Sequence, residues 1–81
     1  MMVKFDYSLL IGRIITKFKT RRAFADKMKM SEHTLSKKLN NHNPFDQSEM
    51  VKAVKLLEDT TESIKPYFFT IKVQQVEQKG A

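Results

Sequence analysis

The chain has 81 residues and a formal net charge of +6, and it contains no cysteine. This length accommodates a single domain. Without cysteine the domain has neither disulfides nor cysteine-ligated zinc, so its stability must come from packing of its 41% hydrophobic residues. Lys and Arg interrupt every apolar stretch, which excludes a membrane span and a signal-peptide core. We therefore expect a soluble cytoplasmic protein with no membrane contact.

The excess positive charge is confined to one third of the chain. Residues 13–38 contain nine Lys and Arg against two acids, a net charge of +7, whereas the rest of the chain sums to −1. A charge field localised in this way favours a surface that binds a polyanion such as nucleic acid. The alternative is a solvated basic face that has no partner.

The first half of the chain shows helical periodicity. Apolar residues recur at helical spacing over residues 7–18 and predict an amphipathic helix. Thr20 is a candidate cap for a second helix, and Ser31 is a candidate cap for a third. Leu35 and Leu39 lie four residues apart, on one face of that third helix.

The second half predicts a loop and two further helices. The Asn-rich run of residues 40–43 precedes Pro44, so we expect a loop there. Asp46 with Glu49 resembles a capping box and predicts a fourth helix near residues 46–58. Because Pro66 lacks a backbone donor, we expect only a short fifth helix or helical turn at residues 60–67.

From Phe68 onward, Phe69, Ile71 and Val73 alternate with polar residues, which is typical of a half-buried strand. Such a strand has no partner in an otherwise helical chain. It either pairs with its copy in a dimer or forms a tail that packs by its aromatic residues. Residues 77–81 are predicted to be disordered.

Residues 21–41 form the most informative stretch. Two short helical segments flank a turn of three or four residues, an arrangement typical of a helix-turn-helix motif. The helices of this motif cross steeply, and Ala25 is the small residue placed at the crossing. Met30 and Leu35 are predicted to pack inward and fix the angle. The exposed N-terminal residues of the second helix would then point into the DNA major groove.

This stretch, RRAFADKMKMSEHTLSKKLNN, resembles the lambda-type repressor and Cro family of phage proteins. Over residues 4–75 the chain is similar to small Cro-like proteins of Gram-positive phages and prophages, through FDYSLLIGRI, TLSKKLNN and YFFTIKVQ. The resemblance implies an all-α, five-helix lambda-repressor-like domain over residues 1–76, with its motif at residues 20–41. One departure is Lys29, where the family's turn usually has glycine; a left-handed backbone there costs a non-glycine residue about 1 kcal/mol.

By position in this family, Glu32, His33 and Lys37 are the predicted base contacts. Lys37 can donate to guanine O6 and N7, and Glu32 can accept from cytosine N4. Alternatively, Glu32 only stabilises the positive end of its helix. His33 can bond a base or a phosphate, or remain solvated. A zinc site with His42 lacks a third ligand, so we expect no metal.

Short polar and basic side chains around the motif are the predicted phosphate contacts, because such groups position a protein on the DNA backbone. Each also has a structural explanation, as a helix cap, a turn former or a solvated charge. The predicted set is Thr20, Arg21, Arg22, Thr34, Ser36, Lys38, Asn40 and Asn41.

These features together predict a sequence-specific DNA-binding regulator of a phage, prophage or mobile element. It would bind double-stranded DNA as a homodimer, occlude an operator and lie on the nucleoid when bound. The predicted dimer contacts are Phe68, Phe69, Ile71 and Val73. No catalytic set is present, so we expect no enzyme and no cofactor. Two alternatives stay open: a protein-interaction module of the antirepressor or antitoxin type that uses an apolar patch at residues 67–71, and a non-specific accessory factor.

Overall fold

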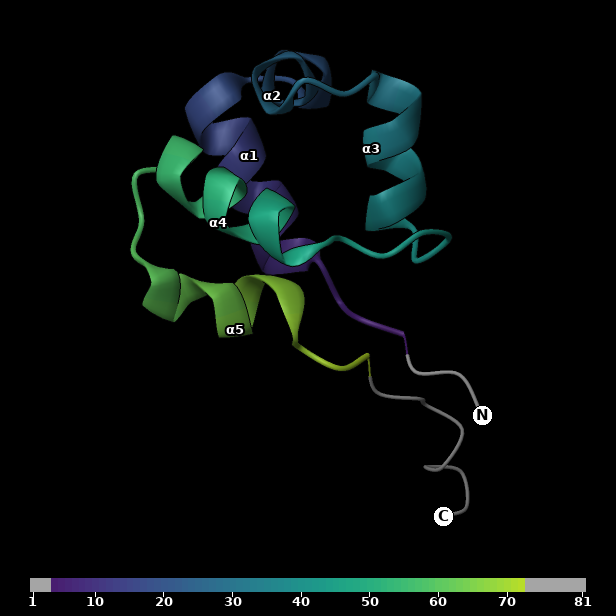
Figure 1. The fold of residues 1–81 in the computed structure, drawn as a ribbon, viewed down its shortest axis with the longest axis vertical. Coiled ribbons are helices and arrows are strands. Elements are labelled where there is room, and N and C mark those ends of the chain that lie inside the picture. Colours follow the sequence, from purple (N-terminus) through teal and green to yellow (C-terminus); the bar gives the residue numbers. More distant parts are fainter. Residues whose placement is uncertain (1–3, 73–81) are drawn as a thin grey trace.

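The computed structural model describes residues 4–72, which fold into five α-helices and one 3-10 helix (Figure 1). The expected all-α class is confirmed, because this part of the chain contains no sheet and only an isolated bridge between Phe5 and Ile71. None of the helices described is long and apolar enough to cross a membrane. The elements are α1 (Ser8–Phe18), α2 (Arg21–Met28), α3 (Glu32–Leu39), α4 (Gln47–Leu56), η1 (Thr61–Ser63) and α5 (Ile64–Phe68).

Three helices begin at the capping residues that the sequence predicts. The side-chain oxygen of Thr20 accepts the Ala23 N–H at 3.1 Å, and that of Ser31 accepts the Thr34 N–H at 3.0 Å. At α4 the capping box is complete. Asp46 accepts the Glu49 N–H at 2.8 Å, and the Glu49 carboxylate accepts the Asp46 N–H at 3.0 Å. Each such cap stabilises its helix by about 1 kcal/mol.

Four helices end in a non-glycine residue of positive φ, the first of which is Lys19 after α1 with φ 73°. Lys29, Asn41 and Glu58 have φ of 65°, 66° and 61° at the ends of α2, α3 and α4. In each case two successive amides donate to carbonyls of the last turn, as in a Schellman motif. Lys29 adopts the left-handed backbone that glycine, usual at this turn of the family, would accept without strain, with ψ of 40°. Each of these ends carries a conformational cost that glycine would avoid.

The core forms where the five helices meet. Its largest fully buried side chains are Phe24, Phe68, Leu10, Ile14, Leu35, Leu57 and Val54. Ala25 is fully buried where α2 contacts α3, as the predicted crossing requires. Pro66 is the third residue of α5, so its missing N–H lies in the first turn, where no intrahelical partner exists. The fifth helix therefore tolerates the proline.

The strand or tail expected from Phe68 onward does not begin at Phe68. Phe68 is the last residue of α5 and is only 1% exposed, so it is a core residue and is not available as a dimer contact. The segment that follows does find a partner within the chain. Ile71 forms an antiparallel bridge with Phe5, flanked by a hydrogen bond from Asp6 N to Thr70 O at 2.7 Å. Val73 and the predicted disordered tail, residues 77–81, lie outside the described residues.

Candidate functional site

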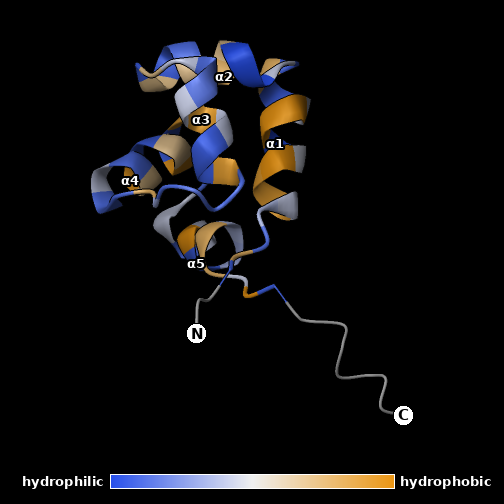
Figure 2. Ribbon diagram, turned by 90° about the vertical axis from the view of Figure 1, so that its right-hand side faces the viewer, coloured by the Kyte–Doolittle hydropathy of each residue, from blue (hydrophilic) through white to orange (hydrophobic). Residues whose placement is uncertain are grey.

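Helices α2 and α3 have the steep crossing of a helix-turn-helix motif. Figure 1 shows α2 nearly end-on and α3 from the side, at one edge of the molecule. Leu35 and Leu39 turn inward from α3, and Met30 packs against the core from the turn. Figure 2, which faces α3, shows hydrophilic residues over most of α2 and α3. The motif therefore presents a polar outer surface of two short helices.

The three predicted base contacts lie together on that surface. Glu32 and His33 open α3, and Lys37 follows about one turn later; all three are exposed. Their positions alternate with the buried leucines, which is why the helical period placed them outside. Glu32 lies in the first turn, so it also interacts favourably with the positive end of the helix. This geometry permits base contact and the structural role equally.

Two predicted phosphate contacts are engaged within the fold instead. Lys38 is only 13% exposed, donates to Pro44 O at 2.9 Å and pairs with Glu49 at 3.1 Å. The Asn41 amide accepts the Phe5 N–H at 2.9 Å and donates to Phe5 O at 3.0 Å. Both side chains hold the loop after α3 in place, and their role as phosphate contacts stays a prediction.

The other predicted phosphate contacts divide between caps and free side chains. The Thr20 hydroxyl caps α2, and the Thr34 hydroxyl accepts a hydrogen bond from Ser31 at 2.9 Å. Arg22 and Asn40 are exposed, whereas Arg21 and Ser36 are half-buried. Arg22 is thus the best placed of the set to reach a polyanion.

Acids from the second half of the chain neutralise part of the basic segment. Arg13 lies 3.6 Å from Asp59, and Lys17 lies 2.6 Å from Glu58; the third pair is the one between Lys38 and Glu49. Three of the nine basic residues in 13–38 are therefore paired with carboxylates from beyond that segment. Within residues 4–72 the basic side chains of the segment outside such pairs are Lys19, Arg21, Arg22, Lys27, Lys29 and Lys37.

The Arg13 pair belongs to a small polar network that fastens α1 to α5. The Arg13 guanidinium donates to the Tyr67 hydroxyl and to Leu57 O, each at 3.2 Å, and the hydroxyl donates to Asp59. Burial, together with the hydrogen bond to Asp59, raises the pKa of Tyr67. The hydroxyl is therefore protonated at neutral pH and donates to the Asp59 carboxylate. Tyr67 is only 5% exposed, which removes it from the apolar patch predicted at residues 67–71.

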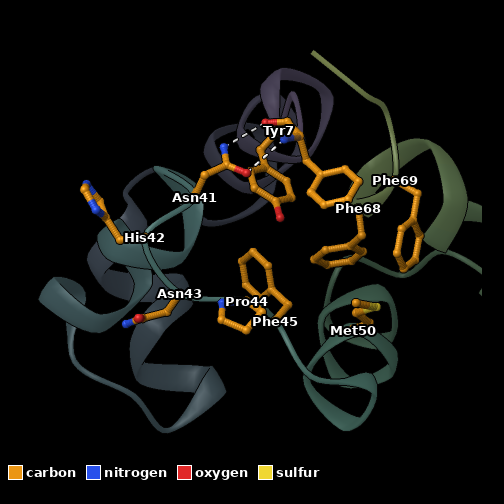
Figure 3. Close-up of a pocket in the computed structure, with 10 residues that line it drawn as sticks. Tyr7, Asn41, His42, Asn43, Pro44, Phe45, Met50, Phe68 and Phe69 are labelled. Carbon is orange, nitrogen blue, oxygen red and sulfur yellow. Dashed lines mark hydrogen bonds between the residues drawn. The ribbon is translucent and has the colours of Figure 1, made fainter. Parts of the chain in front are cut away.

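A second candidate surface is a pocket of about 350 Å³ between the loop after α3, the N-terminal segment and α5 (Figure 3). Most of its wall is aromatic or apolar. Burial raises the pKa of Tyr7, so the hydroxyl seen at the pocket in Figure 3 is protonated at neutral pH. The lining residues are Phe5, Tyr7, Asn41, His42, Asn43, Pro44, Phe45, Met50, Phe68 and Phe69.

Exposed apolar side chains continue this pocket onto the surface. Phe69 is 47% exposed and Ile71 is 60% exposed. Phe69 packs edge-on against Phe5, with ring centroids 5.9 Å apart, and both rings line the pocket. We call the pocket with Phe69 and Ile71 the aromatic surface. A concave apolar site with a few polar groups suits an apolar side chain of a partner. The sequence alternation indicated Phe69 and Ile71 but gave no sign of the pocket.

Metal ligation has no support in the part of the chain that is described, where no three His, Cys, Asp or Glu side chains gather closely enough to hold an ion.

Comparison with known proteins identifies two similarities. The family described as "Protein of unknown function (DUF739)" matches residues 2–71. Among solved structures, the modulator of repression (MOR) of the temperate bacteriophage TP901-1 from Lactococcus lactis matches with a TM-score of 0.72 and 43% sequence identity, over 86% of this chain and 95% of that chain. No curated protein matches significantly. The predicted resemblance to small phage proteins is thus supported, and membership of the lambda-type repressor and Cro family stays a prediction.

Proposed function

The chain belongs to the DUF739 family, and from its likeness to a phage modulator of repression we propose that it regulates repression in a phage or prophage by binding another protein. The observation that carries this proposal is 43% identity to that modulator over 86% of the chain. The helix-turn-helix fold alone does not decide between protein and DNA as the partner. We place this activity in the bacterial cytoplasm and propose no enzymatic reaction.

The aromatic surface is the part of the molecule best suited to a protein partner. A pocket of about 350 Å³ lies beside two apolar side chains that are about half exposed. Contiguous apolar patches rimmed by polar residues mark interaction sites on soluble proteins. Binding energy at such sites comes mostly from a few side chains anchored in pockets. The partner we propose is the repressor whose action is modulated, contributing an apolar anchor to this pocket.

Sequence-specific DNA binding is the second candidate. Its support is the exposed row of Glu32, His33 and Lys37 on α3, beside basic side chains that make no ion pair within residues 4–72. Glu32 disfavours indiscriminate phosphate binding, which argues against a non-specific accessory factor. Against this candidate, three basic residues are neutralised, and Lys38 and Asn41 are engaged internally. Protein binding therefore comes first.

Isothermal titration calorimetry tests the first candidate by measuring the affinity of this chain and its variants for the repressor encoded by the same genome. Ile71→Ser and Phe69→Ala remove exposed apolar area, and we expect each to weaken binding at least tenfold, or about 1.4 kcal/mol. Lys37→Ala, on the other surface, is the control and should change the affinity less than twofold. Circular dichroism of each variant checks the fold. Equal affinity for all variants would contradict a role for the aromatic surface.

The DNA candidate is tested by selection from a random duplex library with the full chain. A roughly palindromic site bound ~10³-fold more tightly than scrambled DNA, with preference at one base pair lost in Lys37→Ala, would place DNA binding first. Arg22→Ala should then weaken binding to all sequences alike. Weak binding that is uniform across sequences and lost at higher salt would leave the protein-binding proposal in place.

A further inference from the structure

The outer face of α1 carries exposed apolar side chains and contains no charged residue. Leu9 is 52% exposed and Ile15 is 42% exposed, although 30% of the residues in this chain are charged. Figure 2 shows most of the α1 ribbon, buried residues included, in hydrophobic colours that polar residues interrupt. The charged residues of α1, Arg13 and Lys17, pair with Asp59 and Glu58 on another side of the helix. We call Ser8, Leu9, Gly12, Ile15 and Thr16, which helical spacing places on one side, the α1 face.

Gly12 lies at the centre of this face without an internal reason to be glycine. An added Cβ would meet no atom within 4 Å, and the residue is in an ordinary helical conformation. Glycine is the least favourable residue after proline in a helix interior. Within this molecule alone, alanine would serve better. Glycine in such a place permits close approach of another backbone.

The two hydroxyl groups of the face already have hydrogen-bond partners, and that of Ser8 donates to the Asp6 carboxylate at 2.6 Å. The Thr16 hydroxyl donates to the Gly12 carbonyl at 2.9 Å, which turns the hydroxyl onto the helix backbone. A partner that covers this face therefore does not have to replace a hydrogen bond between that hydroxyl and water. Covering it removes mainly apolar area from contact with solvent.

The face is self-complementary about Gly12. Leu9 and Ile15 lie one step of three residues before and after it, and Ser8 and Thr16 lie one step of four. An antiparallel copy of α1 crossing at Gly12 would place Leu9 opposite Ile15 and Ser8 opposite Thr16, twice by symmetry. A two-fold dimer requires this kind of self-matching patch.

The distribution of charge also favours a second copy of this chain as the partner of the α1 face. Each copy carries a net charge of +6, so two copies repel unless they meet on an uncharged surface. The α1 face provides such a surface, because Arg13 and Lys17 at its flank are already neutralised by carboxylates of their own chain. The exposed basic residues of the helix-turn-helix surface could not meet their own copies in this way.

We propose that the α1 face binds a second copy of this chain, with two α1 helices packed antiparallel and crossing at Gly12. This assigns self-association to α1 in place of the predicted contact through Phe68, Phe69 and Ile71. A crossing of two eleven-residue helices buries less area than a standard interface. The dimer is therefore weak, with a dissociation constant of ~100 µM. The proposal is independent of which partner the regulator binds.

Sedimentation equilibrium of the full chain from 10 µM to 1 mM tests this proposal. Gly12→Gln places a bulky, uncharged helix former at the crossing, where the isolated chain has open space. We expect it to weaken dimerisation at least tenfold while the melting temperature stays equal or rises. Leu9→Lys brings like charges into the contact and should have the same effect. Lys55→Gln, at an exposed position of α4, is the matched control and should leave the dissociation constant within twofold.

The opposite result is equally clear. A wild-type chain that stays monomeric at 1 mM overturns the proposal. So does a dimer that Gly12→Gln and Leu9→Lys leave intact but Ile71→Ser abolishes, because that result returns the contact to the C-terminal segment. Chemical-shift changes on dilution of isotope-labelled protein provide a second readout, and they should concentrate at residues 8–16.

Discussion

Replacing Lys29 by glycine should stabilise the protein although it removes a basic residue. Lys29 ends α2 with φ 65° and ψ 40°, a conformation that costs a residue with a Cβ about 1 kcal/mol. The hydrogen bonds of this helix end, from Lys29 N to Asp26 O and from Met30 N to Ala25 O, come from the backbone and survive the change. The exposed side chain makes no ion pair within residues 4–72. We expect a gain of about 1 kcal/mol, which raises the melting temperature of a domain of this size by about 4–8 °C.

Urea unfolding and thermal melting followed by circular dichroism measure this gain. Lys29→Asn removes the same charge but tolerates the left-handed region less well than glycine, so it should recover only part of the gain. Lys27→Gly, in the last turn of α2, removes the same charge at a helical position and should cost up to about 1 kcal/mol. Repeating the series in 0.5 M NaCl screens the effect of the lost charge. A Lys29→Gly variant no more stable than the wild type would refute the reasoning.

Three further predictions concern stability. Asn41→Ala removes both hydrogen bonds to Phe5 and should lower the free energy of unfolding by about 1–3 kcal/mol in urea titrations; unchanged stability with weaker DNA binding would instead favour phosphate contact. Ala25→Leu overfills the buried contact between α2 and α3 and should cost about 1–3 kcal/mol, visible as a lower melting temperature. The pKa of the Asp46 carboxyl is lowered chiefly by the hydrogen bond from Glu49 N–H, and the pKa of the Glu58 carboxyl chiefly by the hydrogen bond from Lys17. Both carboxylates therefore stabilise the folded protein fully at a pH above the ordinary carboxyl pKa of about 4. This stabilisation is lost as the pH falls through their lower folded-state pKa values. Urea unfolding at pH 7, 4 and 3 should show that loss, and Asp46→Asn should reduce it; equal pH dependence in the variant would contradict the assignment.

The parts of the fold that depend on local chemistry could be predicted from the sequence. Thr20, Ser31 and Asp46 each cap a helix through the backbone amide three residues later, so a short window of sequence contains the whole interaction. The steep crossing of the motif indicated the small residue at Ala25, and the resemblance to a family with glycine at the turn drew attention to the backbone at Lys29. The helical period also placed Glu32, His33 and Lys37 on the solvent side of α3.

The parts that depend on distant residues could not be predicted. No short window shows that Asp59 lies beside Arg13, so the basic segment looked more strongly charged than the folded surface is. Lys38 was assigned to phosphate by its residue type, whereas its neighbours in space are Glu49 and Pro44. The alternation of apolar and polar residues after α5 indicated an extended chain, and Ile71 does pair as an extended residue. Its partner is Phe5, at the opposite end of the sequence, which the alternation could not indicate.

The bridge between Phe5 and Ile71 also determines the order in which the molecule assembles. Contacts such as those of α1 with α2 and of α2 with α3 join neighbours along the chain, whereas this bridge closes nearly its full length. The entropic cost of closing a loop rises with the length of the loop. We therefore expect the helical core to form first and the two ends of the chain to join last. The reverse motion opens the ends without unfolding the core, and the amides of Asp6 and Lys72 should then exchange with solvent sooner than those of the buried helices. Phe5 and Phe69 wall the pocket, so we expect this opening to change the shape of the pocket while the helical core stays folded.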